Sequence, residues 1–249
     1  MNHFIRLLEQ KGELIRINQF VDPVLEIAEI TERFCKQPDG GKALLFENTG
    51  TAFPVLTNSM GSERRICATL GVAQLDDAAT LIEKLFKDIT SPKKSWLSKF
   101  SLLNDLRRVA SWMPKSVKGR GICQEVILRD PDLGILPILK CRDADGGRFI
   151  TLPMVHTKDP QTGIRNVGMY RMQVMDAQIT GMHWHRHKTG ARHYRECKDL
   201  GKLMPIAVAL GGDPIYTYSA TARITPKECD TSITAKFFSI TSWLINRSI

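Results

Sequence analysis

The chain has 249 residues, 43% of them hydrophobic and 24% charged, with a formal net charge of +9. This composition is typical of a globular protein, and the length suits one large domain or two of ordinary size. No stretch approaches the roughly 18 apolar residues that span a bilayer, and the N-terminus lacks the apolar run of a signal peptide. We therefore expect a cytoplasmic protein.

Six cysteines are scattered singly, and no C-x-x-C pair occurs. This spacing excludes the usual zinc-finger and dithiol redox motifs. In a reducing compartment the cysteines are expected to be free thiols.

Positive charge is concentrated in residues 91–120, where eight basic residues accompany a single acid, Asp105. Such a segment can bind nucleic acid or an anionic membrane surface. A solvated helix face followed by a linker has the same composition, and this is the interpretation that we adopt. No nucleic-acid partner is therefore expected, and peripheral membrane contact remains the alternative.

The first third of the chain alternates helix and strand patterns. Asp22-Pro23 predicts a helix start, with Asp22 as N-cap and Pro23 in the first turn. Asp76 and Asp77 predict the start of a later helix. In chain order the expected elements are a helix at 4–10, a strand at 13–18, a helix ending near 38–41, strands at 42–48 and 53–58, and a helix from 76.

Residues 113–124 combine proline, glycine, serine and like charges, which is typical of a domain boundary. Beyond them strand patterns dominate, with one helix from about 191 to 203. The expected strands lie within 125–130, 148–159, 166–185 and 205–212. The fold class is α+β, with an N-terminal α+β domain at 1–115 and a second, strand-rich domain at 122–222.

The segment GMHWHRHKTG, residues 181–190, contains three of the six histidines. Residues two apart share one face of a strand, so a regular strand would point His183, His185 and His187 the same way. A turn at 176–178 would fold residues 166–171, NVGMYR, alongside them. Asn166 and Arg171 would join the histidines, although their spacing of five places them on opposite faces of a regular strand.

This set of side chains suits an anion, a divalent ion, or both. Arginine holds phosphate or carboxylate, neutral imidazole ligates metals, and an amide oxygen prefers hard cations. The segment Lys188-Thr189-Gly190 adds a helix N-terminus that could hold an anion. The alternative is ordinary: histidines on a half-buried strand are often hydrogen-bonded wall residues.

Long segments resemble the UbiD family, whose members are decarboxylases that use prenylated flavin mononucleotide. The main one reads DGGRFITLPMVHTKDPQTGIRNVGMYRMQVMDAQITGMHWHRHKTGARHYRE. LLEQKGELIRINQFVDPVLEIAEI, LRDPDLGILPIL and PIAVALGGDPIYTYSATA resemble the family's N-terminus and later strands. The resemblance covers about residues 4–222. It implies an α+β N-terminal domain, a flavin-binding split β-barrel and a C-terminal α/β domain.

The resemblance also implies residue roles. Asn166 matches a ligand of a divalent ion, usually manganese, that bridges to the flavin phosphate, and His187 matches a histidine beside that ion. Arg171 matches the active-site arginine. The cofactor-binding positions implied are Met169, Tyr170, Arg171, His183, Trp184, His185, His187, Lys188 and Thr189.

The implied reaction is non-oxidative decarboxylation of an aromatic or α,β-unsaturated acid, most commonly a 4-hydroxy-3-polyprenylbenzoate in quinone biosynthesis. The expected cofactors are prenylated FMN, supplied by a flavin prenyltransferase, and a divalent ion such as Mn²⁺. The full-length family is expected to form homo-oligomers.

After Ala222 the resemblance is expected to end. Residues 223–249 have the character of an unrelated tail, produced by a frameshift or by natural truncation, and the C-terminal domain is expected to be absent. The family's acidic metal ligand and its proton-donating carboxylates would lie beyond Ala222. The sequence thus favours a truncated decarboxylase, with an inactive flavin-phosphate-binding fragment as the alternative.

Overall fold

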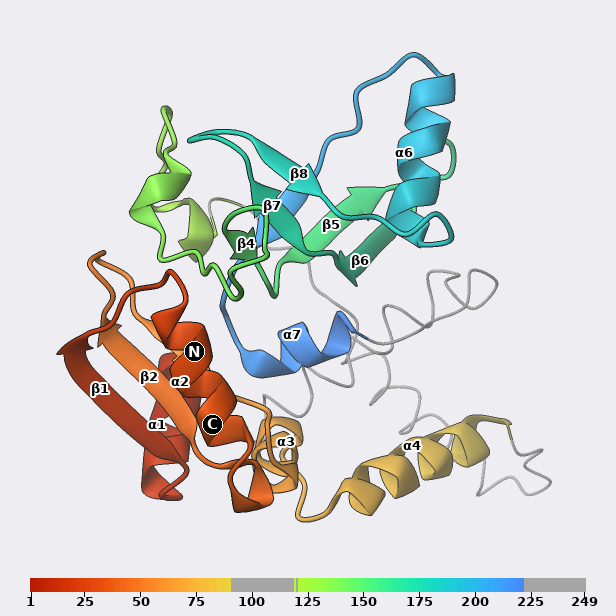
Figure 1. Ribbon diagram of the computed structural model, residues 1–249. Helices are drawn as coiled ribbons and strands as arrows, with labels where there is room; N and C mark the ends of the chain where they lie inside the picture. The colour runs from red at the N-terminus through yellow and green to blue at the C-terminus, as the bar shows by residue number, and fades with distance from the viewer. Residues whose placement is uncertain (91–118, 120, 222–249) are drawn as a thin grey trace, which may run out of the picture.

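The computed structural model describes residues 1–90, 119 and 121–221 (Figure 1). Within these residues the fold is α+β, as predicted, with three small sheets of three strands each. The basic segment at 91–120 lies almost wholly outside the described residues, and so does the tail at 223–249. No helix in the described part is long and apolar enough to cross a membrane.

The first sheet is formed by β1 (Leu14–Phe20), β2 (Ala43–Asn48) and β3 (Val55–Thr57). β1 and β2 run parallel, which requires a crossover, and α2 (Glu26–Cys35) supplies it. α1 (Asn2–Gln10) packs Phe4 and Leu8 against the sheet near Ala43, while a second cluster gathers around Ile27 and Phe46. These helices and strands confirm the first elements expected from the sequence.

The predicted start of α2 at Asp22-Pro23 is wrong by one turn. The Asp22 carboxylate accepts a hydrogen bond from the backbone nitrogen of Val24 at 2.7 Å, forming a turn rather than a helix cap. Leu25 has φ +73° and donates its N–H to the carbonyl of Lys140. A tertiary pairing with the second half of the chain therefore competes with the first turn of the helix, which begins at Glu26.

The sequence prediction missed the next helix along the chain and placed the one after it correctly. α3 (Glu63–Leu70) begins at the N-cap Ser62 and ends at Gly71 with φ +67°, two signals that bracket it in the sequence. It buries Arg65 completely, where the guanidinium donates to Glu13 at 2.8 Å. α4 (Leu75–Thr90) carries Asp76 and Asp77 in its first turn, as predicted.

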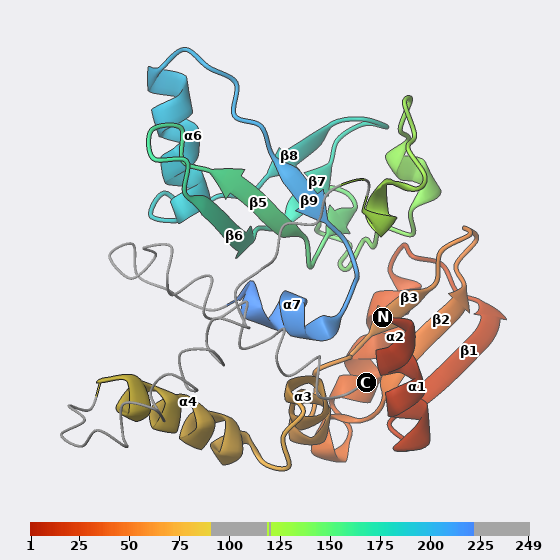
Figure 2. The same cartoon turned by 180° about the vertical axis from the view of Figure 1, so that it is seen from behind.

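The second half of the described chain contains two more sheets. One has the order β4-β7-β8 and the other the order β6-β5-β9, with β5 in the middle (Figure 2). Tyr170 and Arg171 connect β6 to β7 and so carry the chain from one sheet to the other. The strands are β4 (Phe149–Ile150), β5 (Met154–Lys158), β6 (Arg165–Met169), β7 (Met172–Val174), β8 (Thr180–Met182) and β9 (Ala207–Ala209).

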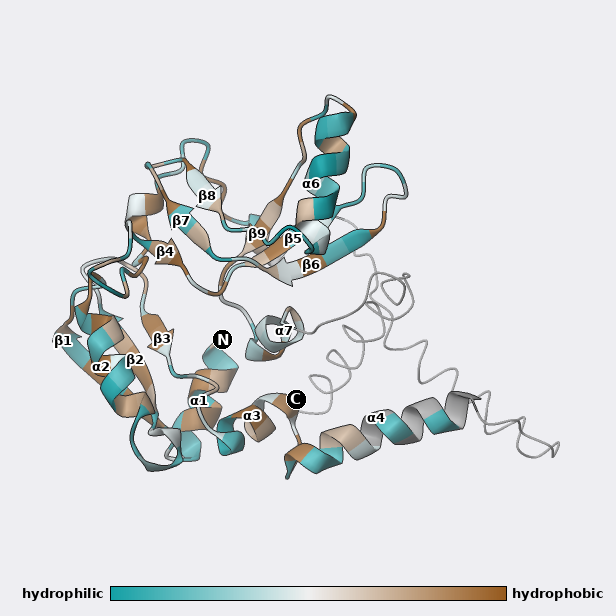
Figure 3. Ribbon diagram, turned by 45° about the vertical axis from the view of Figure 1, so that its right-hand side comes forward, coloured by the Kyte–Doolittle hydropathy of each residue, from teal (hydrophilic) through white to brown (hydrophobic). Residues whose placement is uncertain are grey.

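A core between these sheets contains Ile138, Ile150, Val155, Tyr170 and Met172. α6 (Thr189–Asp199) turns Ala191, His193 and Cys197 inward, and its other side is mostly hydrophilic (Figure 3). The remaining elements are α7 (Pro214–Ser219) and the short helices η1 (Pro38–Gly40), η2 (Ile122–Gln124) and η3 (Leu133–Ile135).

Two strand predictions are wrong. Residues 125–130 pair with no strand of the described chain, and Val126 is 78% exposed. The predicted histidine strand ends at Met182, because its partner β7 begins at Met172. The backbone of His183 still donates to the carbonyl of Arg171 at 3.0 Å, but there the neighbouring chain crosses to the other sheet.

The five cysteines in the described part of the chain are free thiols, as expected; they are Cys35, Cys67, Cys123, Cys141 and Cys197.

Candidate functional site

The β5–β6 hairpin places Thr157 directly opposite Asn166. Its register is set by the turn at 159–163, where the Asp159 carboxylate accepts hydrogen bonds from the backbone nitrogens of Gln161 and Thr162, each at 2.9 Å. Gly163 follows with φ +74°, a conformation that glycine adopts without strain. The amide Nδ2 of Asn166 lies 3.5 Å from Thr157 Oγ1.

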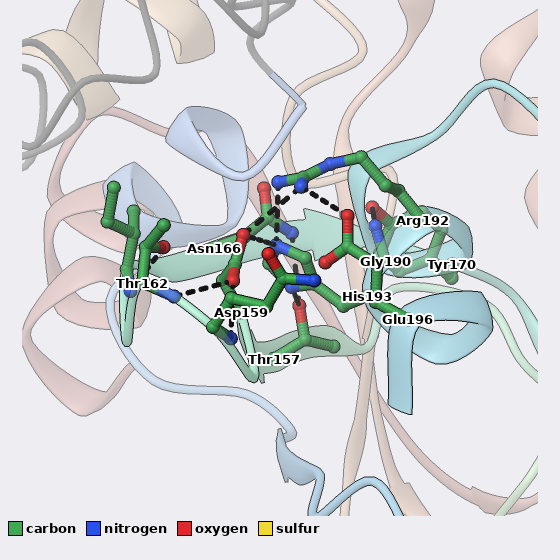
Figure 4. A network of polar contacts seen from close by, with 11 residues as sticks. Thr157, Asp159, Thr162, Asn166, Tyr170, Gly190, Arg192, His193 and Glu196 are labelled. Atoms are coloured by element: carbon green, nitrogen blue, oxygen red, sulfur yellow. Dashed lines mark hydrogen bonds and ion pairs between the residues drawn. The ribbon is translucent and has the colours of Figure 1, made fainter. Parts of the chain in front are cut away.

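Helix α6 lies against this hairpin and contributes a buried histidine. His193 is 1% exposed, and its Nδ1 lies 3.0 Å from Thr157 Oγ1 (Figure 4). Burial lowers the pKa of His193, and the guanidinium of Arg192 beside the ring lowers it further. His193 is therefore neutral at neutral pH.

Charged groups complete the network on the outer side of His193. Arg192 donates to Asp159 at 3.1 Å and to Glu196 at 2.7 Å. Burial alone would raise the pKa of the Asp159 carboxyl. Hydrogen bonds from Thr162, Gln161 and Arg192 outweigh that effect and lower the pKa to about 2. The carboxylate stays ionised and holds both the hairpin turn and Arg192.

Tyr170 joins the end of β6 to the start of α6. Its hydroxyl accepts a hydrogen bond from the backbone nitrogen of Gly190 at 3.2 Å, and its ring packs edge-on against Trp184 with centroids 6.2 Å apart. Trp184 also lies against Tyr194. The indole Nε1 of Trp184 is buried without a hydrogen-bond partner in the described chain.

Tyr170 is only 5% exposed, so the residue is almost wholly covered within the described part of the chain. Met169 beside it is half-buried in β6.

His183, His185 and His187 of the segment 181–190 lie in the loop from β8 to α6, and all three are exposed. The rings of His183 and His185 pack edge-to-face with centroids 5.4 Å apart. Arg195 donates from α6 to the carbonyl of Arg186 at 2.9 Å, which ties the loop to the helix.

The loop leads into the N-terminus of α6. Lys188 is the N-cap residue, has no side-chain capping hydrogen bond and is exposed, while Thr189 begins the helix. Arg171 lies elsewhere, with its guanidinium carbon 4.1 Å from the centre of the Phe149 ring.

The structure brings some of the predicted residues together and separates others. Asn166 lies on the hairpin covered by α6, whose first turn follows His187 and Lys188. No hydrogen bond joins Asn166 to His187 within the described residues, and Arg171, in the connection from β6 to β7, lies against Phe149 of β4. The described residues also contain no group of three or more His, Cys, Asp or Glu side chains arranged to hold a metal ion.

Sequence reasoning missed the buried network around His193. Its members come from β5, the turn and α6, and they are Thr157, Asp159, Arg192, His193 and Glu196. One signal was present: counting back from the Asp-Pro-Gln-Thr-Gly turn pairs Thr157 with Asn166. The contact from His193 had no sequence signal, because it depends on how α6 packs across the hairpin.

Two domain families match parts of this chain. The 3-octaprenyl-4-hydroxybenzoate carboxy-lyase N-terminal domain matches residues 5–85, and the Rift-related domain of the same enzyme matches residues 115–239. The chain belongs to the UbiD family. The match to the Rift-related domain ends at residue 239, beyond Ala222 and outside the described residues. The predicted domain bounds and the predicted tail at 223–249 therefore stay predictions.

The curated relatives are about twice as long as this chain. A protein of Aquifex aeolicus is 46% identical over 228 residues, which cover 91% of this chain and 46% of the relative. A protein of Archaeoglobus fulgidus is 43% identical over 226 residues, which cover 90% of this chain and 45% of the relative. Both bear the name "Uncharacterized protein". The chain thus spans about half the length of the curated relatives it matches.

Solved structures of decarboxylases share the fold. The vanillic acid decarboxylase of Sedimentibacter hydroxybenzoicus in closed form superposes with a TM-score of 0.74 at 27% identity, covering 96% of this chain and 48% of the enzyme. The UbiD-class enzyme HmfF of Pelotomaculum thermopropionicum in complex with FMN gives 0.68 at 25% identity, covering 98% and 48%. An evolved dimeric form of HmfF in complex with prFMN gives 0.65 at 26% identity, covering 93% and 50%.

Proposed function

We propose that this chain supplies the flavin-phosphate and metal-binding part of a prenylated-FMN-dependent decarboxylase. The parent reaction is non-oxidative removal of CO2 from an aromatic or α,β-unsaturated acid. Membership of the UbiD family supports this proposal, as do structural relatives in complex with FMN and prFMN. Within that class we propose a 4-hydroxy-3-polyprenylbenzoate of quinone biosynthesis as the substrate.

One observation carries the proposal: the Asn166 amide is held by Thr157 on the hairpin that α6 covers. An amide oxygen and a neutral imidazole are both ligands that Mn²⁺ accepts, so Asn166 and His187 suit a divalent ion. Neither side chain carries a charge, so the ion keeps its full positive charge and can neutralise a phosphate dianion.

The surroundings also fit a bound flavin phosphate. A helix N-terminus attracts anions, and the N-cap residue of α6, Lys188, makes no side-chain capping hydrogen bond. The exposed ammonium of Lys188 adds a mobile positive charge, and Thr189 adds a hydroxyl. The buried Nε1 of Trp184 is a donor that a ligand oxygen or nitrogen could satisfy. We propose that Met169, Tyr170, His183 and His185 contribute the remaining cofactor contacts.

Arg171 is proposed to hold the substrate carboxylate. A guanidinium forms two parallel hydrogen bonds to a carboxylate, and the Phe149 ring beneath it restricts its orientation. Arg171 cannot move the proton itself, because guanidinium does not release a proton near neutral pH. When bound, prenylated flavin supplies the electron sink that decarboxylation requires.

The wider proposals follow from the family. A flavin prenyltransferase supplies the cofactor, an aromatic acid is the small-molecule partner, and the full-length protein forms a homo-oligomer.

The metal assignment is tested by retention of FMN on the purified chain with and without Mn²⁺. Asn166→Ala and His187→Ala should each lower Mn²⁺-dependent retention by about tenfold or more, as expected for loss of a group that holds the ion. His183→Ala is the matched control from the same loop: because His183 is proposed to contact the flavin and not the ion, the part of FMN retention that depends on Mn²⁺ should change little. Equal losses of Mn²⁺ in the His183 and His187 variants would contradict the role given to His187.

A further inference from the structure

We propose that Thr157 and His193 are positioning residues that fix the Asn166 amide with its oxygen directed toward the divalent ion. This inference rests on the proposed function, because it assigns a purpose to the buried network behind a proposed metal ligand. Neither residue would touch the ion or the substrate. Both act through Asn166.

The proton position on His193 follows from its neighbours. Arg192 Nη2 lies 3.1 Å from His193 Nε2, and a guanidinium can only donate hydrogen bonds. Nε2 must therefore be the acceptor. A neutral imidazole carries one N–H, which is then at Nδ1 and donates to Thr157 Oγ1 at 3.0 Å.

His193 thereby fixes the hydroxyl of Thr157. Thr157 is 3% exposed, and one lone pair of its oxygen is occupied by the Nδ1–H of His193. The second lone pair faces Asn166 Nδ2 at 3.5 Å, a long hydrogen bond that a bound ion would be expected to tighten. With Nδ2 turned toward Thr157, the Oδ1 atom lies on the other side of the amide.

The opposite amide orientation is unfavourable when a cation is bound. It would let the Thr157 hydroxyl donate to Oδ1, but it would turn the NH2 group, with its two partial positive hydrogens, toward the ion. The hydroxyl also accepts from Asn166 in the orientation that the structure contains. Groups that hold a metal ligand through its second polar atom commonly change metal affinity when removed.

The outer charges hold His193 in place. Arg192 is itself fixed by Asp159 and Glu196, so its guanidinium remains directed at Nε2. The chain of contacts runs from the hairpin turn at Asp159, through Arg192 and His193, to Thr157 and Asn166 (Figure 4).

The first test needs no metal. A long-range proton–nitrogen NMR spectrum of the chain at pH 7, with His193 assigned by comparison with His193→Asn, distinguishes the two neutral tautomers from imidazolium. The proton is expected at Nδ1. A proton at Nε2, or on both nitrogens, would overturn the inference whatever the metal site does.

The second test measures the affinity for Mn²⁺ of the FMN-loaded chain, from the electron paramagnetic resonance signal of the free ion. Thr157→Val keeps the side-chain shape and removes the hydroxyl, and it should weaken Mn²⁺ binding by about tenfold. Thr157→Ser keeps the hydroxyl and should stay within about threefold of the unaltered chain, well below the loss expected when such a partner is removed. His193→Leu should resemble Thr157→Val, whereas His193→Asn, which keeps an N–H near the Nδ1 position, should recover much of the affinity.

A control separates positioning from general loss of stability. Ile27 is fully buried on helix α2 in the N-terminal part of the fold, and Ile27→Val should lower stability while leaving Mn²⁺ affinity unchanged. If Thr157→Val binds Mn²⁺ normally and Asn166→Ala does not, the positioning role is wrong and the proposed function stands. If Asn166→Ala binds Mn²⁺ normally, or the unaltered chain does not bind it, the metal assignment and the positioning role are both wrong.

Discussion

The Tyr170 hydroxyl accepts a hydrogen bond from the backbone nitrogen of Gly190 at 3.2 Å. This bond connects the end of β6 to the first turn of α6, where helix N–H groups have no partner within the helix. It also engages the Gly190 N–H, which would otherwise be available to bind an anion. The Tyr170 ring thus fixes the helix N-terminus at the candidate site.

Tyr170→Phe tests the strength of this connection. The substitution leaves the buried Gly190 N–H without an acceptor, so the free energy of unfolding should fall by about 1–3 kcal/mol. Urea denaturation of the two proteins measures the difference. Tyr194→Phe is the matched control, because Tyr194 is 49% exposed, and its stability should change little. Equal effects of the two substitutions would contradict a specific role for the Tyr170 hydroxyl.

Gly168→Ala should be more damaging than an ordinary strand substitution. A Cβ at Gly168 would lie 2.6 Å from the Tyr170 ring, which is buried and cannot move aside easily. Overpacking of this kind lowers the free energy of unfolding by about 1–3 kcal/mol. Gly181→Ala is the control: its Cβ would meet only the flexible end of Met175 at 2.9 Å. A loss in the Gly181 variant as large as that in the Gly168 variant would refute this explanation.

Lowering the pH should destabilise the β5–β6 hairpin, because the Asp159 carboxylate becomes protonated. Its pKa is lowered from 3.8 to about 2 in the folded protein, so its stabilisation is fully present above pH 3.8 and declines as the pH falls toward 2. Between pH 5 and pH 2 this carboxylate should account for about 2 kcal/mol of lost unfolding free energy. Urea denaturation at both pH values measures this loss of unfolding free energy. The loss should be correspondingly smaller in Asp159→Asn than in the unaltered protein. Identical losses in the two proteins would be inconsistent with the lowered pKa.

If Arg171 holds the substrate carboxylate, substituting Arg171 should weaken substrate binding more than substituting Phe149, whose ring lies against the guanidinium. Arg171→Gln removes a charge-assisted hydrogen bond, worth about 1.5–3 kcal/mol, and should weaken calorimetric binding of 4-hydroxybenzoate to the FMN-loaded chain by about tenfold or more. Phe149→Leu leaves the guanidinium and removes only the cation–π contact, so a loss of a few-fold is expected. Unchanged binding by Arg171→Gln would exclude this role.

The basic segment at 91–120 is expected to bind duplex DNA only non-specifically. At physiological salt the dissociation constant should be no tighter than about 10⁻⁴ to 10⁻⁶ M. A fluorescence anisotropy titration with a labelled duplex at several salt concentrations measures it. Nanomolar affinity with a steep salt dependence would instead indicate a nucleic-acid surface.

Local sequence signals were enough to predict most helices and strands, and longer similar segments identified the family. A glycine predicted the end of α1, Asp76 and Asp77 predicted the start of α4, and helical spacing predicted α6 to within a few residues, because these signals act over one or two helical turns. The break between the expected strands at 148–159 and 166–185 likewise predicted the β5–β6 connection. Long similar segments identified the family, which two family descriptions confirm.

The places where the polar residues meet depend on tertiary packing, which the local patterns do not specify. The alternation of His183, His185 and His187 predicted a strand, but a strand needs a hydrogen-bonded neighbour, and that neighbour leaves the sheet at Arg171. β6 pairs with β5 rather than with β8, so Asn166 faces Thr157 instead of the exposed histidines. His193 gave no sequence signal, because its burial depends on α6 lying across two strands. Local patterns specify a residue's own conformation, whereas its partners depend on how distant elements pack.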